Sequence, residues 1–350
     1  MLPFASPKFT RWYPQFAEVF EAVLEDHCST ALQEFRDGSS TRCPDHRRYG
    51  SATFLKCSIQ TVLDCLLENT SESVKTATAA ASVLLGFLPT ILGLVGSSTA
   101  ESGLIALRRP VLTTLLALGA PAMSPIRTFE YRTPTELLSS RADSIEIPRM
   151  GAVPSAAITA LQYLLAAAAA VNTAHVSWQL GNQAFCSLDV DSDFFPLVWS
   201  SVSVVVFALG SISTYIRVSL VSVAPTRSRC LGGFLRSEFT LSANRGDFKL
   251  HVKQERYMFI LLSWLTSVLT VLYILFGTVV LSSIQFVGAE DALGTFGRYF
   301  ASAVVCRSIL MFEMSGMRSR AALMPQRVNV DHIGLISQVT RKERIPTYLY

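Results

Sequence analysis

Four long apolar runs constrain the fold of this chain more than any other feature of its sequence. They cover residues 76–96, 152–176, 195–217 and 257–287. A helix needs about 20 mainly apolar residues to cross the roughly 30 Å hydrocarbon layer of a bilayer, because no water is available there to pair the backbone groups. Each run meets this requirement. The sequence therefore predicts an all-α, multi-pass membrane protein.

A shorter apolar segment follows the first run and leaves the number of spans open. Residues 104–123 (LIALRRPVLTTLLALGAPAM) hold about 14 uninterrupted apolar residues after Arg108 and Arg109, which is the length of a re-entrant or interfacial helix. Ser98 and Glu101 form the pattern of a capping box at its start. Arginine beside a short apolar helix is typical of an anchor at the headgroup level, and we favour this role for the arginine pair over a functional one.

Residues 296–314 are long enough to span the membrane but contain charged side chains that are costly against lipid. We therefore expect a span whose polar residues face other helices. Arg307 and Glu313 are six residues apart, on opposite helix faces, so each needs a partner such as Glu290, Asp291 or an arginine of another element. We interpret them as snorkelling side chains or as structural polar contacts between helices, and a polar path for a substrate is the alternative.

Lysine and arginine are distributed unevenly between the loops, which predicts the orientation. Loops 177–194 and 288–295 contain neither residue, whereas 224–256 contains seven and 124–151 contains four. Basic loops stay on the cytoplasmic side, so we expect these two loops and the C-terminal tail in the cytoplasm. The N-terminal region lies outside if there are five spans, which we favour, and inside if the segment with the arginine pair makes a sixth.

The chain divides into three predicted parts. Residues 1–75 form an amphipathic helical N-terminal region, 76–317 the transmembrane helix bundle, and 318–350 a basic cytoplasmic tail. Charged residues make up only 16% of the chain, below the roughly 25% typical of soluble domains. The arginines form no basic stripe, which argues against nucleic acid as a partner. We expect the lipid bilayer and other membrane proteins as partners, in the plasma membrane or an endomembrane.

Two amphipathic helices are predicted in the N-terminal region, over residues 16–35 and 52–67. We interpret them as a small helical cap, packed on itself or on the bundle; a partner-binding or membrane-surface helix is the alternative. Asn69 begins an Asn-Thr-Ser pattern for N-glycosylation. An even number of cysteines in the same region would allow two disulfides if it is lumenal; they are Cys28, Cys43, Cys57 and Cys65.

Two further candidates lie near the expected outer end of the bundle. The acidic loop 189–193 (DVDSD) has oxygen ligands suited to a hard cation, but the calcium-loop pattern fails at Phe194, where glycine is required. We interpret it as a solvated acidic loop. His175, with Asn172 and Gln162 on the same predicted helix, could begin a proton or metal site, but no paired-histidine spacing supports one. We interpret it as an interfacial histidine.

The sequence contains no motif of a known catalytic or cofactor site. A serine-hydrolase elbow, a Walker A loop, a dinucleotide-binding glycine pattern and paired Cys-x-x-Cys spacings are all missing from it. We therefore assign no catalytic, cofactor-binding or metal-binding residue and expect no cofactor.

A block of about sixty residues, from Cys65 through LLENTSE, Lys75 and AAASVLLGFLPTILGLVGSSTAESGLIALRRPVLTTLLALGAPA to Ala122, resembles a family of uncharacterised multi-pass membrane proteins of filamentous fungi. The likeness is greatest at the centre of the first span and at the arginine pair with the proline that follows it. The resemblance implies a fungal membrane protein and carries over no activity, cofactor, substrate or catalytic residue.

Three functions fit these observations. We expect a non-enzymatic structural, accessory or sensor-like membrane component, because no catalytic constellation is present. A small-solute transporter is the first alternative, and it predicts a polar cavity at mid-membrane that includes Arg307. An enzyme embedded in the membrane and acting on a lipid or terpenoid is the second, and it predicts carboxylates or histidines converging beside an apolar pocket.

Overall fold

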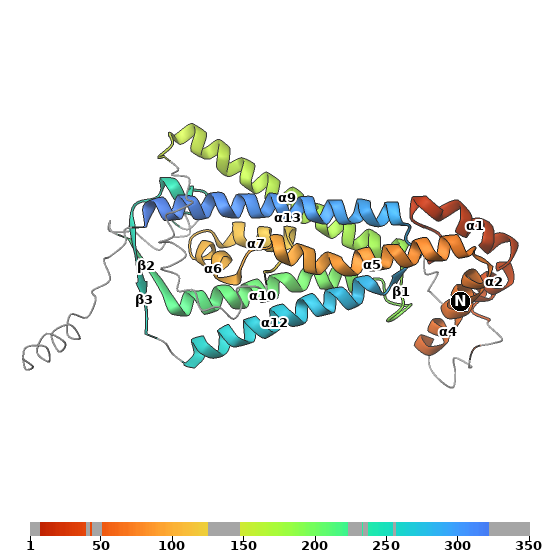
Figure 1. Ribbon diagram of the computed structural model, residues 1–350. Coiled ribbons are helices and arrows are strands. Elements are labelled where there is room, and N and C mark those ends of the chain that lie inside the picture. Colours follow the sequence, from red (N-terminus) through yellow and green to blue (C-terminus); the bar gives the residue numbers. More distant parts are fainter. Residues whose placement is uncertain are drawn as a thin grey trace, which may run out of the picture.

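Five long helices run side by side in an elongated bundle in the computed structural model (Figure 1), which describes residues 8–39, 43, 51–124, 148–222, 233, 237–254 and 257–321. Each is long and apolar enough to cross a membrane, so the expected multi-pass, all-α fold is confirmed. The five are α5 (Glu72–Val95), α9 (Ala152–Gln183), α10 (Phe195–Arg217), α12 (Tyr257–Ser282) and α13 (Ala289–Arg320).

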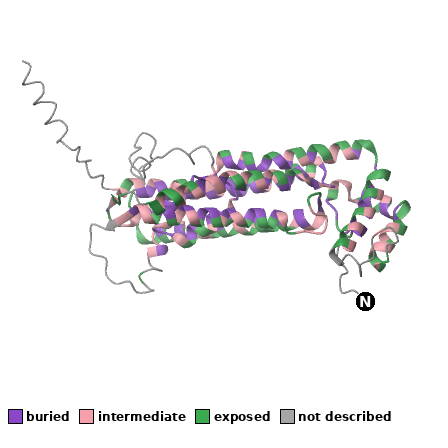
Figure 2. Cartoon of the chain, turned by 90° about the horizontal axis from the view of Figure 1, so that it is seen from below, coloured by how far each residue is buried: buried purple, intermediate pink, exposed green. Residues whose placement is uncertain are grey.

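The outer faces of these helices carry large apolar side chains that the fold leaves uncovered. Exposed residues lie along the outside of the bundle in Figure 2. Phe87, Leu94, Leu164 and Trp264 each keep more than half of their surface exposed. A water-soluble bundle would turn such a continuous apolar surface inward, whereas lipid solvates it without cost. The five helices therefore present the surface of an integral membrane protein.

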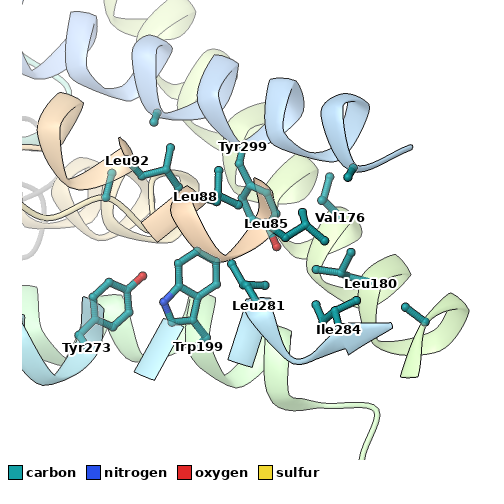
Figure 3. Packing of buried hydrophobic residues seen from close by; sticks show 14 of the residues in the cluster. Leu85, Leu88, Leu92, Val176, Leu180, Trp199, Tyr273, Leu281, Ile284 and Tyr299 are labelled. Carbon is teal, nitrogen blue, oxygen red and sulfur yellow. The ribbon is translucent and has the colours of Figure 1, made fainter. Parts of the chain in front are cut away.

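Aromatic and leucine side chains pack against one another inside the bundle (Figure 3). The ring of Trp199 stacks on Tyr273 and meets Tyr299 edge-on, with both pairs of ring centroids 5.8 Å apart. Leu85 and Leu88 of α5 are fully buried in the same cluster. Pro89 lies inside α5 without ending it. This packing joins α5, α10, α12 and α13 into one unit.

Short two-stranded sheets close the two ends of the bundle (Figure 1). At one end β1 (Phe185–Cys186) pairs with β4 (Ile284–Gln285), and at the other β2 (Val218–Ser222) pairs with β3 (Phe248–Val252). Both pairs are antiparallel. The N-terminal helices lie at the β1–β4 end, and α13 ends at the β2–β3 end (Figure 1).

The N-terminal region folds as a helical cap on the β1–β4 end. Its elements are η1 (Pro14–Phe16), α1 (Ala17–Asp26), α2 (Ser29–Asp37) and α4 (Ser51–Asn69). Phe9, Trp12 and Phe20 pack with Phe185, which lies in β1, and with Phe286, which follows β4. The aromatic cluster is therefore shared between the cap and the membrane helices.

The predicted helix over residues 16–35 is divided in the structure. Its two halves, α1 and α2, are separated at His27 and Cys28. Disulfides join Cys28 to Cys65 and Cys43 to Cys57, so both connect α4 to the preceding part of the cap. The first bond fixes the point where the chain changes direction, which hydrophobic periodicity alone did not indicate.

Residues 104–123 do not form a span. They contain the end of α6 (Thr99–Ala106) and all of α7 (Pro110–Gly119), two helices that are each too short to cross a bilayer. Both helices lie inside the bundle: α6 packs on α10 and α7 on α9. The re-entrant interpretation, and with it the preference for five spans over six, agrees with this arrangement.

The predicted basic tail begins later than expected. Helix α13 continues to Arg320, beyond the predicted boundary at 318. The remainder of the tail, residues 322–350, lies outside the described residues, as do most of the basic loop 124–151 and part of the basic loop 224–256.

Candidate functional site

The chain leaves helical conformation directly after the first span, at a point inside the bundle. Helix α5 ends at Val95, and α6 starts anew at Thr99 after an extended Ser98. The break lies at mid-depth because the residues beside it contact the middle of other helices: the hydroxyl of Tyr273 donates to the carbonyl of Pro121 at 3.1 Å. An added Cβ at Gly96 would lie 2.6 Å from the backbone of Ala122, so only glycine allows this close approach.

Side chains satisfy the exposed N-terminus of α6. The hydroxyl of Ser98 accepts the backbone N–H of Glu101 at 3.2 Å, and the carboxylate of Glu101 accepts the N–H of Ser98 at 3.1 Å. This is the predicted capping box. Non-helical backbone at membrane depth is tolerated only inside protein or beside water, and the two bonds supply the partners that lipid lacks.

An ion pair holds the break to α13. Arg307 donates to Glu101 at 2.7 Å, and the two side chains are 27% and 9% exposed. We expected a residue such as Glu290 or Asp291 as the partner of Arg307, and this prediction was wrong. Both residues lie in the first turn of α13, where Asp291 accepts the backbone N–H of Gln15. Glu101 therefore has two roles, as the cap of α6 and as the counter-charge of Arg307.

A small cavity of about 20 Å³ lies beside this ion pair. Ser97, Ser102, Thr113, Cys306 and Arg307 contribute to its lining, and apolar side chains complete it. The hydroxyls of the two serines are 2.9 Å apart. The volume is enough for about one water molecule. The structure thus places Arg307 at a small, mainly apolar cavity inside the bundle, with a few hydroxyl groups in its lining.

A second buried ion pair joins α13 to the turn between α6 and α7. Arg109 donates to Glu313 at 2.7 Å and to the side chain of Gln162 at 2.6 Å, and both charged side chains are fully buried. The other carboxylate oxygen of Glu313 accepts the hydroxyl of Ser242 at 2.6 Å. Glu313 therefore has an arginine of another element as its partner, as the sequence suggested.

The interpretation of Arg108 and Arg109 as headgroup anchors was wrong. Their side chains are 8% and 0% exposed. The loop before η2 (Ser242–Asn244) covers them: Arg109 donates to the backbone carbonyl of Glu238 at 2.9 Å, and the Glu238 carboxylate accepts the N–H of Leu112 at 3.0 Å in the first turn of α7. A carboxylate at a helix N-terminus complements its dipole, so this loop stabilises the re-entrant helix.

A third polar group lies toward the N-terminal end of α13. Arg298 donates to Asn172 at 3.0 Å and to Gln179 at 2.8 Å, and its guanidinium is 3.0 Å from Nδ1 of His175. His175 and Asn172 thus share one arginine, whereas Gln162 belongs to the distant Arg109 network. The interpretation of His175 as an interfacial residue remains compatible with this contact.

The acidic loop 189–193 contacts the N-terminal cap. Lys8 pairs with Asp193 at 3.0 Å and Lys56 with Asp189 at 2.9 Å. The hydroxyl of Ser192 donates to Asp189 at 2.6 Å, and this bond, with the nearby Lys56, lowers the pKa of that carboxyl. The loop was predicted to be solvated; instead, its carboxylates hold the cap on the bundle.

The polar clusters remain separate from one another. Among the described residues, no group of three or more His, Cys, Asp or Glu side chains is placed to hold a metal ion. Comparison of the chain with protein families, curated proteins and solved structures finds no match. The resemblance to the fungal membrane family therefore stays a prediction.

Proposed function

We propose that this protein moves a small polar or ionic solute across its membrane, with the break between α5 and α6 as the mid-membrane point of the path. The observation that carries the proposal is Arg307: it lines the cavity at the break and pairs there with Glu101. The transporter hypothesis requires a polar cavity that includes this arginine; the cavity here is mainly apolar, and Ser97, Ser102, Thr113 and Arg307 supply its polar groups. Broken helices with ionisable side chains at mid-depth are typical of transport sites.

Breaking the Glu101–Arg307 ion pair would open the path. With Glu101 and Arg307 at 2.7 Å, the cavity holds about one water and is closed to larger solutes. A solute that replaces one partner, or a proton that neutralises Glu101, releases α6 from α13. Because α6 is short and is separated from α5 by non-helical backbone, it can shift without unfolding a complete span.

The proposal includes an orientation of the protein in its membrane, with the N-terminal cap outside and the C-terminus in the cytoplasm. The two disulfides of the cap favour an oxidising, extracytoplasmic compartment for the N-terminal end. The basic residues of the loops at the opposite end favour the cytoplasm for the C-terminus. Five spans require the two ends to lie on opposite sides, so the two arguments agree.

A flux measurement on purified protein in liposomes tests the proposal. Ion conductance is measured in planar bilayers, and the entry of water, glycerol and urea by light scattering of vesicles. We expect flux above that of protein-free membranes, changed at least several-fold by Glu101→Gln or Arg307→Gln. Arg298→Gln is the matched control, because it removes one charge from the same helix away from the break.

The absence of any flux from correctly folded protein would contradict transport. It would favour the non-enzymatic accessory or sensor-like role, in which the two buried ion pairs serve only to hold the re-entrant helices. Flux that is unaffected by both substitutions at the break would place the path elsewhere and would overturn the role of Arg307.

A further inference from the structure

Three arginine side chains at the β2–β3 end of the bundle have hydrogen-bonding capacity that no described residue uses. Nη1 of Arg108, Nη2 of Arg109 and Nε of Arg245 are all shielded from solvent and have no partner among the described residues. The side chains of Arg108 and Arg109 are more than nine-tenths buried. Unpaired N–H groups of a charged guanidinium are costly inside a protein, so the cluster calls for a ligand.

Loop 237–245 connects the three arginines: it contains Arg245, contacts the Arg109 guanidinium and bonds the backbone carbonyl of Arg108. Arg245 donates to the backbone carbonyl of Arg108 at 2.9 Å, and it also contacts the carbonyl of Ser237. Arg109 donates to the carbonyl of Glu238. The ring of Phe248 lies 3.9 Å from the Arg108 guanidinium and fixes its position. Loop 237–245 and the turn between α6 and α7 therefore form one arginine cluster.

Within the part of the chain that the structure describes, the charge of this cluster is not balanced. Two carboxylates, Glu238 and Glu313, face its three arginines, so one positive charge is left over. Both oxygens of Glu313 are already occupied. At the surface, Arg149 and Arg320 share the single carboxylate of Asp247, which adds a further positive charge at the rim. An uncompensated buried charge is strongly unfavourable, so the excess favours an anion.

We propose that this arginine cluster binds a phosphate monoester or free phosphate. Guanidinium groups donate to phosphate oxygens with well-matched geometry. The remaining oxygen of Glu238, Oε2, is also buried and has no partner among the described residues, and a carboxylate needs a donor. A phosphate monoester carries an O–H near neutral pH and supplies that donor, whereas a phosphodiester does not. Arg245 is only partly buried and is the member of the cluster nearest to solvent. This proposal does not depend on transport.

The ligand has two sources, a lipid such as phosphatidic acid or inorganic phosphate, and stability measurements distinguish them. The full chain is placed in phosphatidylcholine nanodiscs, and its unfolding temperature is followed by tryptophan fluorescence. One series adds phosphatidic acid, with phosphatidylglycerol, a phosphodiester, as its anionic control. The other adds inorganic phosphate, with sodium chloride at equal ionic strength as its control. We expect the unfolding temperature to rise by about 2 °C for each tenfold increase of the binding species above its Kd.

Two substitutions test whether the effect arises at this cluster. Arg108→Gln should abolish the rise, and Arg245→Gln provides the same test if the first variant is unstable. Arg217→Gln is the matched control, because it removes one positive charge at the same end of the bundle, where Arg217 binds the carbonyl of Lys253 instead. A rise with phosphatidic acid alone identifies a lipid headgroup, and a rise with inorganic phosphate identifies a free anion.

Three results would overturn the proposal. The first is no rise with either phosphate source in the wild-type chain, a result that does not depend on any variant. The second is an equal rise with phosphatidylglycerol or chloride, which would indicate general charge screening. The third is an unchanged response in folded Arg108→Gln and Arg245→Gln protein.

Discussion

Removing Glu313 should destabilise the protein more than removing its partner Arg109. Glu313 accepts hydrogen bonds from Arg109, Gln162 and Ser242 at 2.6 to 2.8 Å, and its side chain is fully buried. Glu313→Gln keeps the size of the side chain but leaves three arginines facing one carboxylate. Loss of one partner of a buried ion pair costs about 3–5 kcal/mol, and the excess positive charge places this variant at the upper end.

Arg109→Met has a different effect on the same cluster. It leaves two arginines facing two carboxylates, so no net charge remains buried. The lost hydrogen bonds to Gln162 and Glu313 then account for most of the cost, about 1–3 kcal/mol. The difference between the two variants should be about 2–4 kcal/mol, and the Arg109→Met/Glu313→Met double variant should cost less than the sum of the two single changes.

An unfolding experiment measures which variant is less stable. The purified protein in mixed micelles is titrated with a denaturing detergent, and its unfolding is followed by tryptophan fluorescence. Arg298→Gln serves as the reference, because it removes a charge that is only partly buried from the same helix as Glu313. Equal costs for Glu313→Gln and Arg109→Met, or a larger cost for Arg109→Met, would refute the charge imbalance on which the reasoning rests.

Three further predictions concern packing, pH and modification. Gly103→Ala should destabilise the bundle, because the new Cβ would lie 2.8 Å from Cβ of Thr214, whereas Gly294→Ala meets nothing within 4 Å and should be neutral or stabilising in the same unfolding assay. The pKa of Asp189 is lowered in the folded state, so its contribution to stability is present above its unfolded pKa of about 3.9 and is lost as the pH falls through the folded value. Limited proteolysis should therefore release the cap more readily at acid pH, and Asp189→Asn should remove this dependence. Asn69 is exposed at the end of α4, and we expect glycosidase treatment to shift the mobility of the wild-type chain from eukaryotic cells but not that of Asn69→Gln.

The membrane fold was predictable because length and hydropathy are local properties of the sequence. The five long helices lie where the apolar runs and the marginal segment 296–314 predicted them. Periodicity did not show the division at Cys28, because the direction of the chain there depends on a disulfide partner 37 residues away. The end of α13 was also missed, since a polar last turn continues a helix when other elements contact it.

The polar interior was less predictable because each ion pair joins distant parts of the chain. The arrangement of Arg307 and Glu313 on opposite helix faces correctly indicated two separate partners. The partners themselves, Glu101 and Arg109, lie more than 200 residues earlier in the sequence. In the sequence, Arg109 has the features of an interfacial anchor, because its burial depends on loop 237–245, which covers it only in the fold. The unusual density of charge within 98–109, inside an otherwise apolar region, was the one available signal.

Access of water to Cys306 tests the central claim most directly, because this buried thiol lines the cavity at the break. Cys186 and Cys230 are first replaced by serine, and the protein in liposomes is treated with a small, charged, membrane-impermeant thiol reagent. We predict slow labelling of Cys306 in this background and labelling at least tenfold faster when Glu101→Gln weakens the ion pair, with Arg298→Gln leaving the rate unchanged. Equal labelling rates with and without the Glu101–Arg307 pair would contradict the account, because the ion pair would then not control a path to the middle of the membrane.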